Sequence, residues 1–364
     1  MNQNNYSRTY LFGFSLWKQW FIRLAPFFGD HIVFIHTFLG QKPLQKALHK
    51  KLDSNCAIYI WGKQSFPEVE EYARTHGIPL YRVEDGFVRS VGLGSDLTQP
   101  YSLVVDSRGI YFDPTCESDL EHILQYHRFS PDELARGERI RRFMVEKKLS
   151  KYNLYDNIRL DFPKTKQIVV VPGQVEDDAS IRFGAKGMNN LELLRQSRLS
   201  RPDAYIVYKP HPDVLAGNRA GSVEEADALR YCDRIVTEVG IDSVLSHADE
   251  VHTMTSLVGF EALLRGIKVV TYGLPFYAGW GLTEDHQRCD RRSRAITIDE
   301  LVAATYLLYP RYIHPDTFRR CEIEEVLEVL ERKRVATNRS VWVKWRNWLS
   351  RKGQQAIRMM KGKR

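Results

Sequence analysis

Three adjacent acids follow a short apolar run in the middle of the chain. Residues 167 to 171 predict a buried strand, and Glu176, Asp177 and Asp178 come shortly after it. Polar groups that follow a strand of an α/β sheet lie at its carboxyl edge, where reacting residues are usually placed. A carboxylate there can act as a nucleophile or as a general base. A solvated acidic turn that caps the next segment explains the spacing equally well.

A cation and an imidazole follow the next predicted strand, residues 205 to 208. Pro210 and Pro212 hold the backbone extended around Lys209 and His211. Both side chains can donate a hydrogen bond to an oxygen on which charge develops, so the pair suits a leaving phosphate. The alternative is a loop stiffened by the prolines in which the histidine has no role. This interpretation is the weaker one, because two prolines frame a single histidine.

A junction between a strand and a helix lies near residue 255. Residues 251 to 254 predict the strand, and Ser256 can cap the helix that follows. Free amides and the helix dipole favour an anion at such a junction, so Thr255 and Ser256 predict a phosphate site within a nucleotide site. Glu261 lies between one and two turns inside the helix. The next loop, YAGWGLT from Tyr277, is too aromatic and glycine-rich for an idle connector.

In the first half, residues 82 to 90 place two carboxylates and two arginines around a glycine turn. One interpretation is an acceptor-side wall in which Arg89 holds a polar or anionic sugar, because arginine binds a carboxylate through two parallel hydrogen bonds. The other is a strand end stabilised by salt bridges. The segment alone does not decide between them.

These residues need a scaffold that brings strand ends together. Both halves alternate apolar runs with helical patterns, so we predict an α/β protein with two Rossmann-like domains facing a cleft. We also expect a hairpin of residues 102 to 106 and 110 to 112. The predicted parts are an N-terminal acceptor-side domain (1–135), a connector (136–166), a C-terminal nucleotide-binding domain (167–310), a closing helical region (311–331) and a basic amphipathic tail (332–364).

The charge of the chain is concentrated in this tail. The net charge is +8, and twelve basic residues and no acid lie from Arg332 onward; eight minus twelve leaves the rest at −4, which argues against a core that binds nucleic acid. Trp342, Trp345 and Trp348 recur at helical spacing, the pattern of a helix that lies on anionic lipid. Packing of these tryptophans on the protein itself is the alternative.

Five scattered cysteines fit a reducing cytosol. Lys18 and Arg23 interrupt the apolar stretch 10–28, which disfavours a membrane-spanning segment there.

Six ordered motifs together resemble the bacterial capsule polysaccharide biosynthesis family of retaining β-Kdo glycosyltransferases. They are RVEDGFVRSVGLG (82–94), SLVVDSRGIYFD (102–113), GQVEDDASI (173–181), KPHPDVLAG (209–217), TSLVGFEALLRG (255–266) and LPFYAGWGLTED (274–285). The resemblance covers roughly residues 10 to 330 and is greatest to the carboxyl-terminal module of two-module members.

The resemblance implies a GT-B fold, CMP-Kdo as donor, and transfer to a sugar hydroxyl of a capsule linker or other cell-surface glycan through a covalent aspartate adduct. Asp178 stands at the position of the nucleophile, and Glu84 or Asp85 is our candidate for the acceptor proton. His211 and Lys209 would hold the CMP phosphate. The expected donor-binding residues are Gln174, Ser180, Lys209, His211, Thr255, Ser256, Glu261 and Tyr277, and the expected acceptor-binding residues are Arg89 and Glu176.

No metal or other cofactor is expected. The expected partners are CMP-Kdo, a glycan or glycolipid acceptor and, through the tail, anionic lipid on the cytoplasmic face of the inner membrane, with no nucleic acid. One alternative is another GT-B enzyme with a nucleotide-activated donor, such as a CDP-polyol phosphotransferase. A second is a non-catalytic scaffold for capsule assembly.

Overall fold

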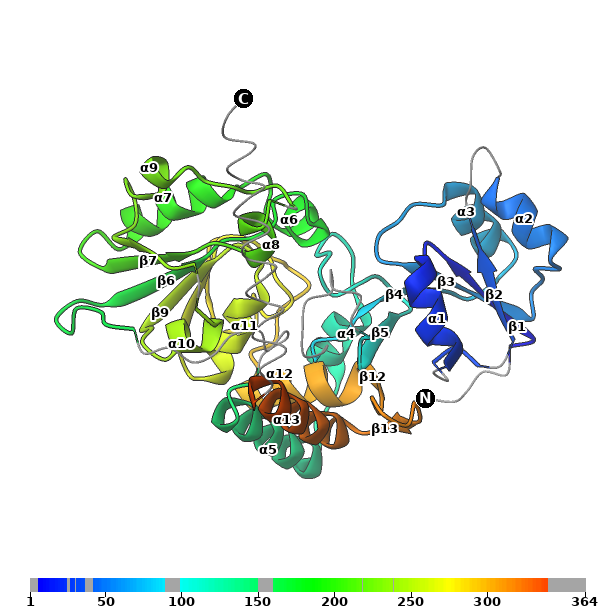
Figure 1. Ribbon diagram of the computed structural model, residues 1–364. Coiled ribbons are helices and arrows are strands. Elements are labelled where there is room, and N and C mark those ends of the chain that lie inside the picture. Colours follow the sequence, from blue (N-terminus) through cyan, green and yellow to red (C-terminus); the bar gives the residue numbers. More distant parts are fainter. Residues whose placement is uncertain are drawn as a thin grey trace.

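The protein is described here by a computed structural model. It describes residues 6–24, 27–29, 31–36, 42–88, 99–149, 160–217, 219–237 and 239–339, and for 334–339 only the course of a helix. Two units, each built on one sheet, lie side by side, the first blue to cyan and the second green to yellow (Figure 1).

In the described residues, the first sheet has seven strands in the order β13-β12-β5-β4-β3-β1-β2. Strands β2, β1, β3 and β4 run parallel, whereas β5, β12 and β13 continue the sheet antiparallel. The strands are β1 (Arg8–Phe12), β2 (Ile32–Ile35), β3 (Cys56–Trp61), β4 (Leu80–Asp85), β5 (Ser102–Asp106), β12 (Pro310–Ile313) and β13 (Arg320–Cys321). The helices of this unit are α1 (Leu16–Leu24), α2 (Pro43–His49) and α3 (Pro67–Thr75). Every residue of β3 is buried, as its unbroken apolar sequence predicts.

The predicted hairpin of residues 102–106 and 110–112 is wrong. β5 pairs with β4 and β12 instead, and residues 110–112 form no strand. The reason is Asp106, whose carboxylate accepts hydrogen bonds from the backbone amides of Arg108, Gly109 and Asp119. An aspartate that bonds to amides two and three residues ahead closes a tight turn and ends the strand.

The second sheet, over the part of the chain that the structure describes, has six parallel strands in the order β11-β10-β9-β6-β7-β8. They are β6 (Ile168–Pro172), β7 (Tyr205–Lys209), β8 (Arg234–Ile235), β9 (Glu250–Thr253), β10 (Lys268–Thr271) and β11 (Glu284–Asp285). The helices between them are α6 (Ala179–Gly184), α7 (Asn190–Ser200), α8 (Pro212–Leu215), α9 (Glu225–Ala228), α10 (Ile241–Leu245) and α11 (Leu257–Leu264). The alternation of strand and helix in this half of the sequence therefore predicts the parallel sheet correctly.

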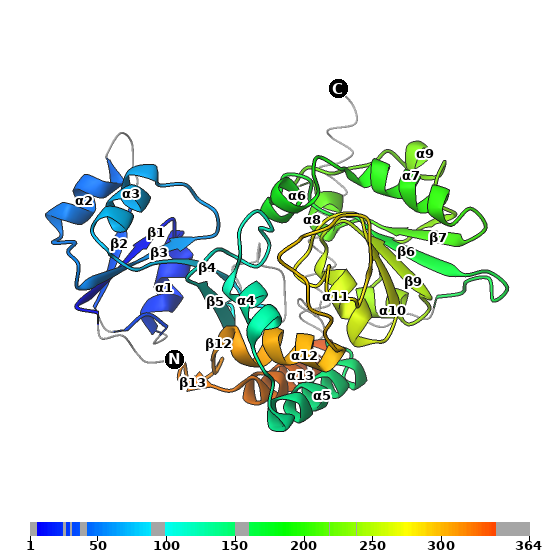
Figure 2. The same ribbon diagram turned by 180° about the vertical axis from the view of Figure 1, so that it is seen from behind.

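The chain returns to the first unit after the second sheet. Helix α12 (Ile298–Val302) continues into the π-helix η2 (Ala303–Leu308), and β12 and β13 then join the first sheet. Part of 311–331, expected to be helical, is therefore strand. The remaining helices are α4 (Asp119–Tyr126), α5 (Pro131–Glu146) and α13 (Ile323–Arg339), and α5, α12 and α13 lie together below the junction of the units in both views (Figures 1 and 2).

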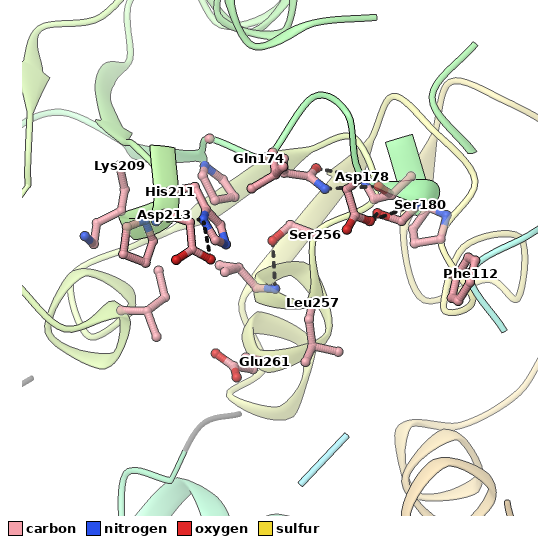
Figure 3. A pocket seen from close by; sticks show the side chains of 18 of the residues that line it. Phe112, Gln174, Asp178, Ser180, Lys209, His211, Asp213, Ser256, Leu257 and Glu261 are labelled. Carbon is pink, nitrogen blue, oxygen red and sulfur yellow. Dashed lines mark hydrogen bonds and ion pairs between the residues drawn. The ribbon is translucent and has the colours of Figure 1, made fainter. Parts of the chain in front are cut away.

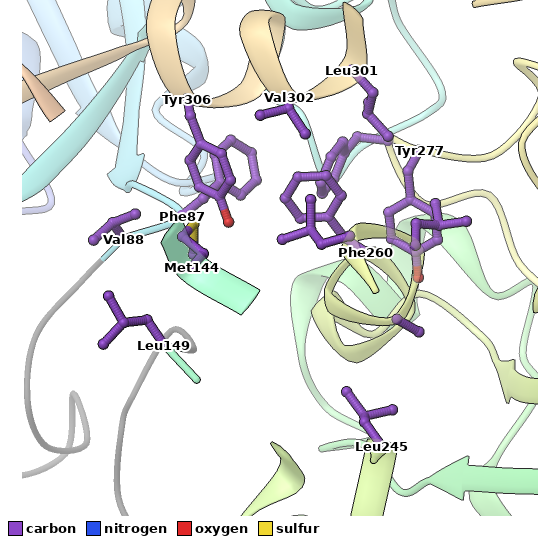
Figure 4. Packing of buried hydrophobic residues seen from close by; sticks show 14 of the residues in the cluster. Phe87, Val88, Met144, Leu149, Leu245, Phe260, Tyr277, Leu301, Val302 and Tyr306 are labelled. Atoms are coloured by element: carbon purple, nitrogen blue, oxygen red, sulfur yellow. The ribbon is translucent and has the colours of Figure 1, made fainter. Parts of the chain in front are cut away.

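One apolar core extends across both units. Phe87, at the end of β4, lies 4.9 Å from Phe276 of the second unit between ring centroids, and Phe276 lies 5.2 Å from Phe260 of α11. Figure 4 shows Phe87, Phe260, Tyr306 and their neighbours in this cluster. Interiors this closely packed deform little, so the shared core fixes how the two units face each other.

Candidate active site

A cleft of about 450 Å³ lies between the two units, at the carboxyl ends of β4, β6, β7 and β9. The first unit contributes Glu84, Asp85, Tyr111 and Phe112 to its lining. The second contributes, among others, Gln174, Asp178, Ser180, Lys209, His211, Thr255, Ser256 and Glu261. The carboxyl ends of four strands thus meet at one cavity, which is where an open α/β sheet binds ligands.

The three consecutive acids after β6 have different surroundings. Oε1 of Glu176 accepts a hydrogen bond from the backbone amide of Asn190, 2.8 Å away, and Asp177 pairs with Arg219 at 3.0 Å. Asp178 alone of the three lines the cleft in the described part of the chain. The carboxylate of Glu176 is turned towards the start of α7, so its predicted contact with the acceptor has no support from the cleft lining and stays a prediction.

Asp178 has a structural task as well as a place in the cleft. It is the N-cap of α6, and its Oδ1 accepts hydrogen bonds from Ser180, from the backbone amide at 2.9 Å and from Oγ at 2.7 Å. No hydrogen bond to its Oδ2 is present among the described residues. One oxygen thus fixes the side chain at the start of α6, and the other accepts no hydrogen bond from the described residues.

His211 is fixed in a similar way at the start of α8. Its Nδ1 accepts a hydrogen bond from the backbone amide of Asp213 at 3.2 Å, so in the neutral ring the proton is on Nε2, which can donate to a ligand. Burial lowers the pKa of His211, against the opposing charges of Asp213 and Asp178. The neutral imidazole is therefore the favoured form near pH 7 in the empty cleft.

Lys209 is the most deeply buried cation of the cleft, with 7% of its surface exposed. Its Nζ donates to the backbone carbonyl of Thr237 at 3.3 Å. Removal from water lowers the pKa of Lys209 from its ordinary 10.5 to about 8. A dianionic ligand in this cleft would favour the charged ammonium, so binding of a phosphate and protonation of Lys209 are expected to be coupled.

The N-terminus of α11 faces the cleft between these groups. Ser256 is its N-cap, with Oγ accepting from the amide of Val258 at 3.2 Å. In Figure 3, Lys209 and His211 lie to the left of Ser256, Asp178 and Ser180 to its right, and Glu261 one turn further along the helix. A helix start with a cation and an imidazole beside it is suited to a phosphate.

Gln174 and Thr255 join two of the loops that line the cleft. Nε2 of Gln174 donates to Oγ1 of Thr255 at 3.0 Å, and its Oε1 accepts from the amide of Thr255 at 2.9 Å. These two bonds hold the end of β6 against the junction of β9 and α11. Gln174 therefore positions the site, whatever contact it makes with a ligand.

Tyr277, which we predict to contact the donor, is not among the described residues that line the cleft, and that contact stays a prediction. Its side chain is fully buried, and its hydroxyl donates to the backbone carbonyl of Ser256 at 2.5 Å. A Cβ on Gly259 would lie 2.2 Å from that hydroxyl, so the glycine makes room for it. Tyr277 thus supports the start of α11 from below, and the aromatic loop serves the site indirectly.

The wall of the cleft formed by the first unit has two carboxylates at the end of β4. Glu84 and Asp85 both line the cleft, and Oε1 of Glu84 accepts a hydrogen bond from the amide of Asp85 at 3.0 Å. Arg82 pairs with Glu70 at 3.0 Å, so part of the segment is the salt-bridged strand end considered above. Arg89, the predicted acceptor-binding arginine, lies outside the described residues.

Several lining residues were not foreseen. Asp242, at the start of α10, lines the cleft and accepts a hydrogen bond from Arg265 at 2.8 Å. Lys148 lies 3.9 Å from the same carboxylate. The preceding strand, β8, has only two residues, so the sequence shows no strand end that would have marked Asp242. Among the described residues, no three His, Cys, Asp or Glu side chains gather into a metal site, and the absence of a metal requirement stays a prediction.

The chain is similar to a set of bacterial capsule proteins. Residues 56–312 match the family model for "Capsule polysaccharide biosynthesis protein". Capsule polysaccharide modification protein LipA of Neisseria meningitidis serogroup B (strain ATCC BAA-335 / MC58) is 46% identical over 332 residues, which are 89% of this chain and 46% of LipA. Lipopolysaccharide-processing protein LpsZ of Rhizobium meliloti is 39% identical over 323 residues, 87% of this chain and 72% of LpsZ. The chain therefore spans about half the length of LipA.

Two solved structures have a similar fold. "Thermosulfurimonas dismutans KpsC, beta Kdo 2,7 transferase" has a TM-score of 0.72 and 37% identity, over 88% of this chain and 98% of that one. "Thermosulfurimonas dismutans KpsC, beta Kdo 2,4 transferase" has a TM-score of 0.74 and 32% identity, over 90% and 98%. Together with the two facing sheets, this likeness shows a GT-B-like glycosyltransferase fold and confirms the predicted fold class.

Proposed function

This chain belongs to the capsule polysaccharide biosynthesis family, and on that premise we propose that it is a retaining β-Kdo glycosyltransferase. In this proposal Kdo moves from CMP-Kdo to a sugar hydroxyl of a capsule linker or another cell-surface glycan. The names of the two KpsC structures support the transferred sugar. The proposed mechanism rests on one observation: the three acids after β6 point in different directions, and of the three only Asp178 lines the cleft.

In the first step, Oδ2 of Asp178 attacks the anomeric carbon of Kdo as the bond from that carbon to the phosphate oxygen of CMP breaks. The electron pair leaves with the phosphate, so the developing charge must be stabilised there. Nε2–H of His211, the ammonium of Lys209 and the start of α11 are the groups proposed for this task. Glu261, one turn along α11, would accept hydrogen bonds from the ribose hydroxyls.

In the second step, the acceptor hydroxyl attacks the same carbon and displaces Asp178 as a free carboxylate. Glu84 or Asp85, on the opposite wall, takes the hydroxyl proton. Each displacement inverts the carbon, so two in sequence retain its configuration. The bonds that Ser180 makes to Oδ1 hold the carboxylate in place through both steps.

The test is substitution of Asp178 by Asn or Ser. Both residues keep an oxygen that can cap α6, so the helix start is preserved while the nucleophile is lost. We expect no transfer, with CMP affinity within roughly threefold of wild type because the carboxylate acts on the sugar and not on the nucleotide. Glu176→Gln and Asp177→Asn are matched controls, since neither carboxylate lines the cleft.

Intact-mass spectrometry with CMP-Kdo and no acceptor supplies a second readout. A Kdo adduct that maps to Asp178, absent in Asp178→Asn, supports the proposal. Turnover at the wild-type rate in either Asp178 variant refutes it. CMP released from CMP-Kdo but no nucleotide released from CDP-polyols distinguishes a Kdo transferase from a polyol phosphotransferase.

We also propose that the enzyme works on the cytoplasmic face of the inner membrane, held there by its basic tail. The charge and tryptophan pattern of residues 332–364 supports this, although residues 340–364 lie outside the described part. Arg332 and Lys333 pair with Asp316 at 2.9 and 2.8 Å, so the first basic residues of the segment are attached to the body of the protein. No helix in the described residues is long and apolar enough to cross a membrane.

A further inference from the structure

Helix α1 exposes two large apolar side chains. Leu16 and Trp20 are 69% and 64% exposed, whereas Phe21 and Ile22 of the same helix are fully buried in the core of the first unit. Residues three or four apart lie on one face of a helix, and Arg23, three positions after Trp20, is on that face and also exposed. The outer face of α1 is therefore an apolar pair that continues into a cation.

Arg23 also lines a shallow hollow at the outer edge of the first sheet. The hollow lies against β2, the edge strand, between the end of α1 and the end of α2. Its charged or titratable lining residues are Arg8, Arg23, His36, His49, Lys50 and Lys51, and no carboxylate is among the residues that line it in the described part of the chain. The hollow thus gathers arginines and lysines from three segments of the sequence.

The cations of the hollow are held by contacts that leave their charge uncompensated. Arg8 donates to the carbonyl of Lys50 at 3.3 Å, Lys50 donates to the carbonyl of Phe34 at 3.5 Å, and Arg23 lies over the Phe34 ring at 5.2 Å. None of the ion pairs between described residues involves Arg8, Arg23, Lys50 or Lys51. Like charges kept this close repel one another, so an anionic partner would stabilise the arrangement.

We propose that this face of the first unit, the hollow together with Leu16 and Trp20, docks on an anionic phospholipid bilayer. Lipid phosphates would occupy the hollow while Leu16 and Trp20 enter the interface between headgroups and acyl chains, as in other basic amphipathic surfaces. A protein partner would need a contact of about 800 Å² on each side, which two exposed apolar side chains do not supply. A bilayer has no such requirement, because each side chain is buried in it separately.

No step of the proposed transfer uses the residues of this face. The face lies at the β2 edge of the first sheet and would make a second membrane contact there. The opposite edge is β13, which directly precedes α13 and the basic tail. Two contacts on one body bind more tightly than either alone and restrict its rotation on the surface. The cleft would then be held in one orientation towards a membrane-bound acceptor.

The test measures binding of the full-length protein to vesicles of phosphatidylglycerol and phosphatidylcholine, with pure phosphatidylcholine as the neutral control. Arg23→Glu with Lys51→Glu removes two cations from the hollow. Lys164→Glu with Lys166→Glu, at an exposed site before β6, makes the same change in net charge elsewhere. We expect the first pair to weaken binding by about twenty-fold or more and the second by less than about threefold. Equal losses in the two pairs would reduce the effect to net charge and overturn the proposal.

Contact of Trp20 with lipid is read separately, so that binding through the tail cannot hide it. Brominated lipids quench tryptophan fluorescence on contact, and Trp20→Phe leaves the other tryptophans in place. We expect quenching in the wild type to exceed that in Trp20→Phe, and no difference would overturn the proposal. Circular dichroism and activity on a soluble acceptor should be unchanged in every variant. A dimer that these substitutions dissociate, with vesicle binding unaffected, would assign the face to a second copy of the chain instead.

Discussion

Replacement of Lys209 by methionine is expected to stabilise the protein and to abolish its function. Lys209 is 93% buried, and its pKa falls from 10.5 to about 8 because the ammonium is removed from water. A shift of this size corresponds to roughly 3 kcal/mol of unfavourable free energy when the side chain is charged in the folded protein. Methionine has a similar length, and the lost hydrogen bond to Thr237 costs about 1 kcal/mol. At pH 7 the variant should therefore be more stable by about 2 kcal/mol.

The contribution of Lys209 to the free energy of unfolding depends on pH, in a direction set by its folded and unfolded pKa values. Between the folded pKa of about 8 and the unfolded pKa of 10.5, the unfolded chain binds more protons at Lys209 than the folded protein does. The contribution of Lys209 to stability therefore rises with pH through that window. Its unfavourable contribution is fully present below pH 8 and vanishes above about pH 10.5. The advantage of Lys209→Met should shrink accordingly as the pH is raised from 7 to 10.

Urea denaturation of both proteins at pH 7, 8.5 and 10 measures the difference. Lys166→Met is the control, because Lys166 is exposed and its replacement should change stability by less than about 0.5 kcal/mol at every pH. Calorimetry at pH 8.5 in buffers of different ionisation enthalpy should show uptake of a proton when CMP binds to the wild type, and none in Lys209→Met. A variant that is less stable than wild type at pH 7, or a difference independent of pH, would refute the argument.

Two further expectations concern the nucleotide and the membrane. His211→Ala and Glu261→Gln should each weaken CMP binding by roughly ten- to a hundred-fold, since each removes a charge-assisted or polar hydrogen bond worth about 1.5–3 kcal/mol. The control, Glu176→Gln, should leave CMP binding unchanged. Calorimetry that finds all three variants at wild-type affinity would show that the site is misplaced. A chain ending before Ser340 should keep its activity on a soluble acceptor and lose much of its binding to anionic vesicles, at about 1 kcal/mol for each basic residue near the surface. Undiminished sedimentation of the truncated chain with those vesicles would place the anchor elsewhere.

The sequence by itself determined the elements that form the site. Short apolar runs predicted β6 and β7 to within one residue at each end, because a strand buried on both faces has few polar positions. Residues 251 to 254 likewise predicted β9, Glu250–Thr253, to within one residue, although three of its four residues are polar. The capping residue Ser256 predicted the start of α11. Since parallel strands place their carboxyl ends at one edge, the sequence also predicted that Asp178, Lys209, His211 and Ser256 would meet, and all four line one cleft.

Only the tertiary structure decided which way individual side chains point. Glu176, Asp177 and Asp178 are equivalent as a sequence, yet the backbone amide of Asn190 and the guanidinium of Arg219 take the first two away from the cleft. Tyr277 is in a loop whose aromatic and glycine residues suggest ligand binding, but its hydroxyl donates a hydrogen bond to the backbone carbonyl of Ser256. Contacts of this kind join residues that are distant in the chain, and no local pattern records them.

The pairing of β5 and the return of the chain to the first sheet also depend on contacts between residues that are distant in the sequence. The sequence near β5 allows a local hairpin, but Asp106 closes a turn, and Tyr309, 203 positions later, donates to its carboxylate at 2.8 Å. β12 then pairs with β5 across an equally long separation. Strand ends and helix caps depend on neighbours in the sequence and can be predicted from it. Partners across the sheet and across the cleft depend on how the whole chain packs, which only the folded structure reveals.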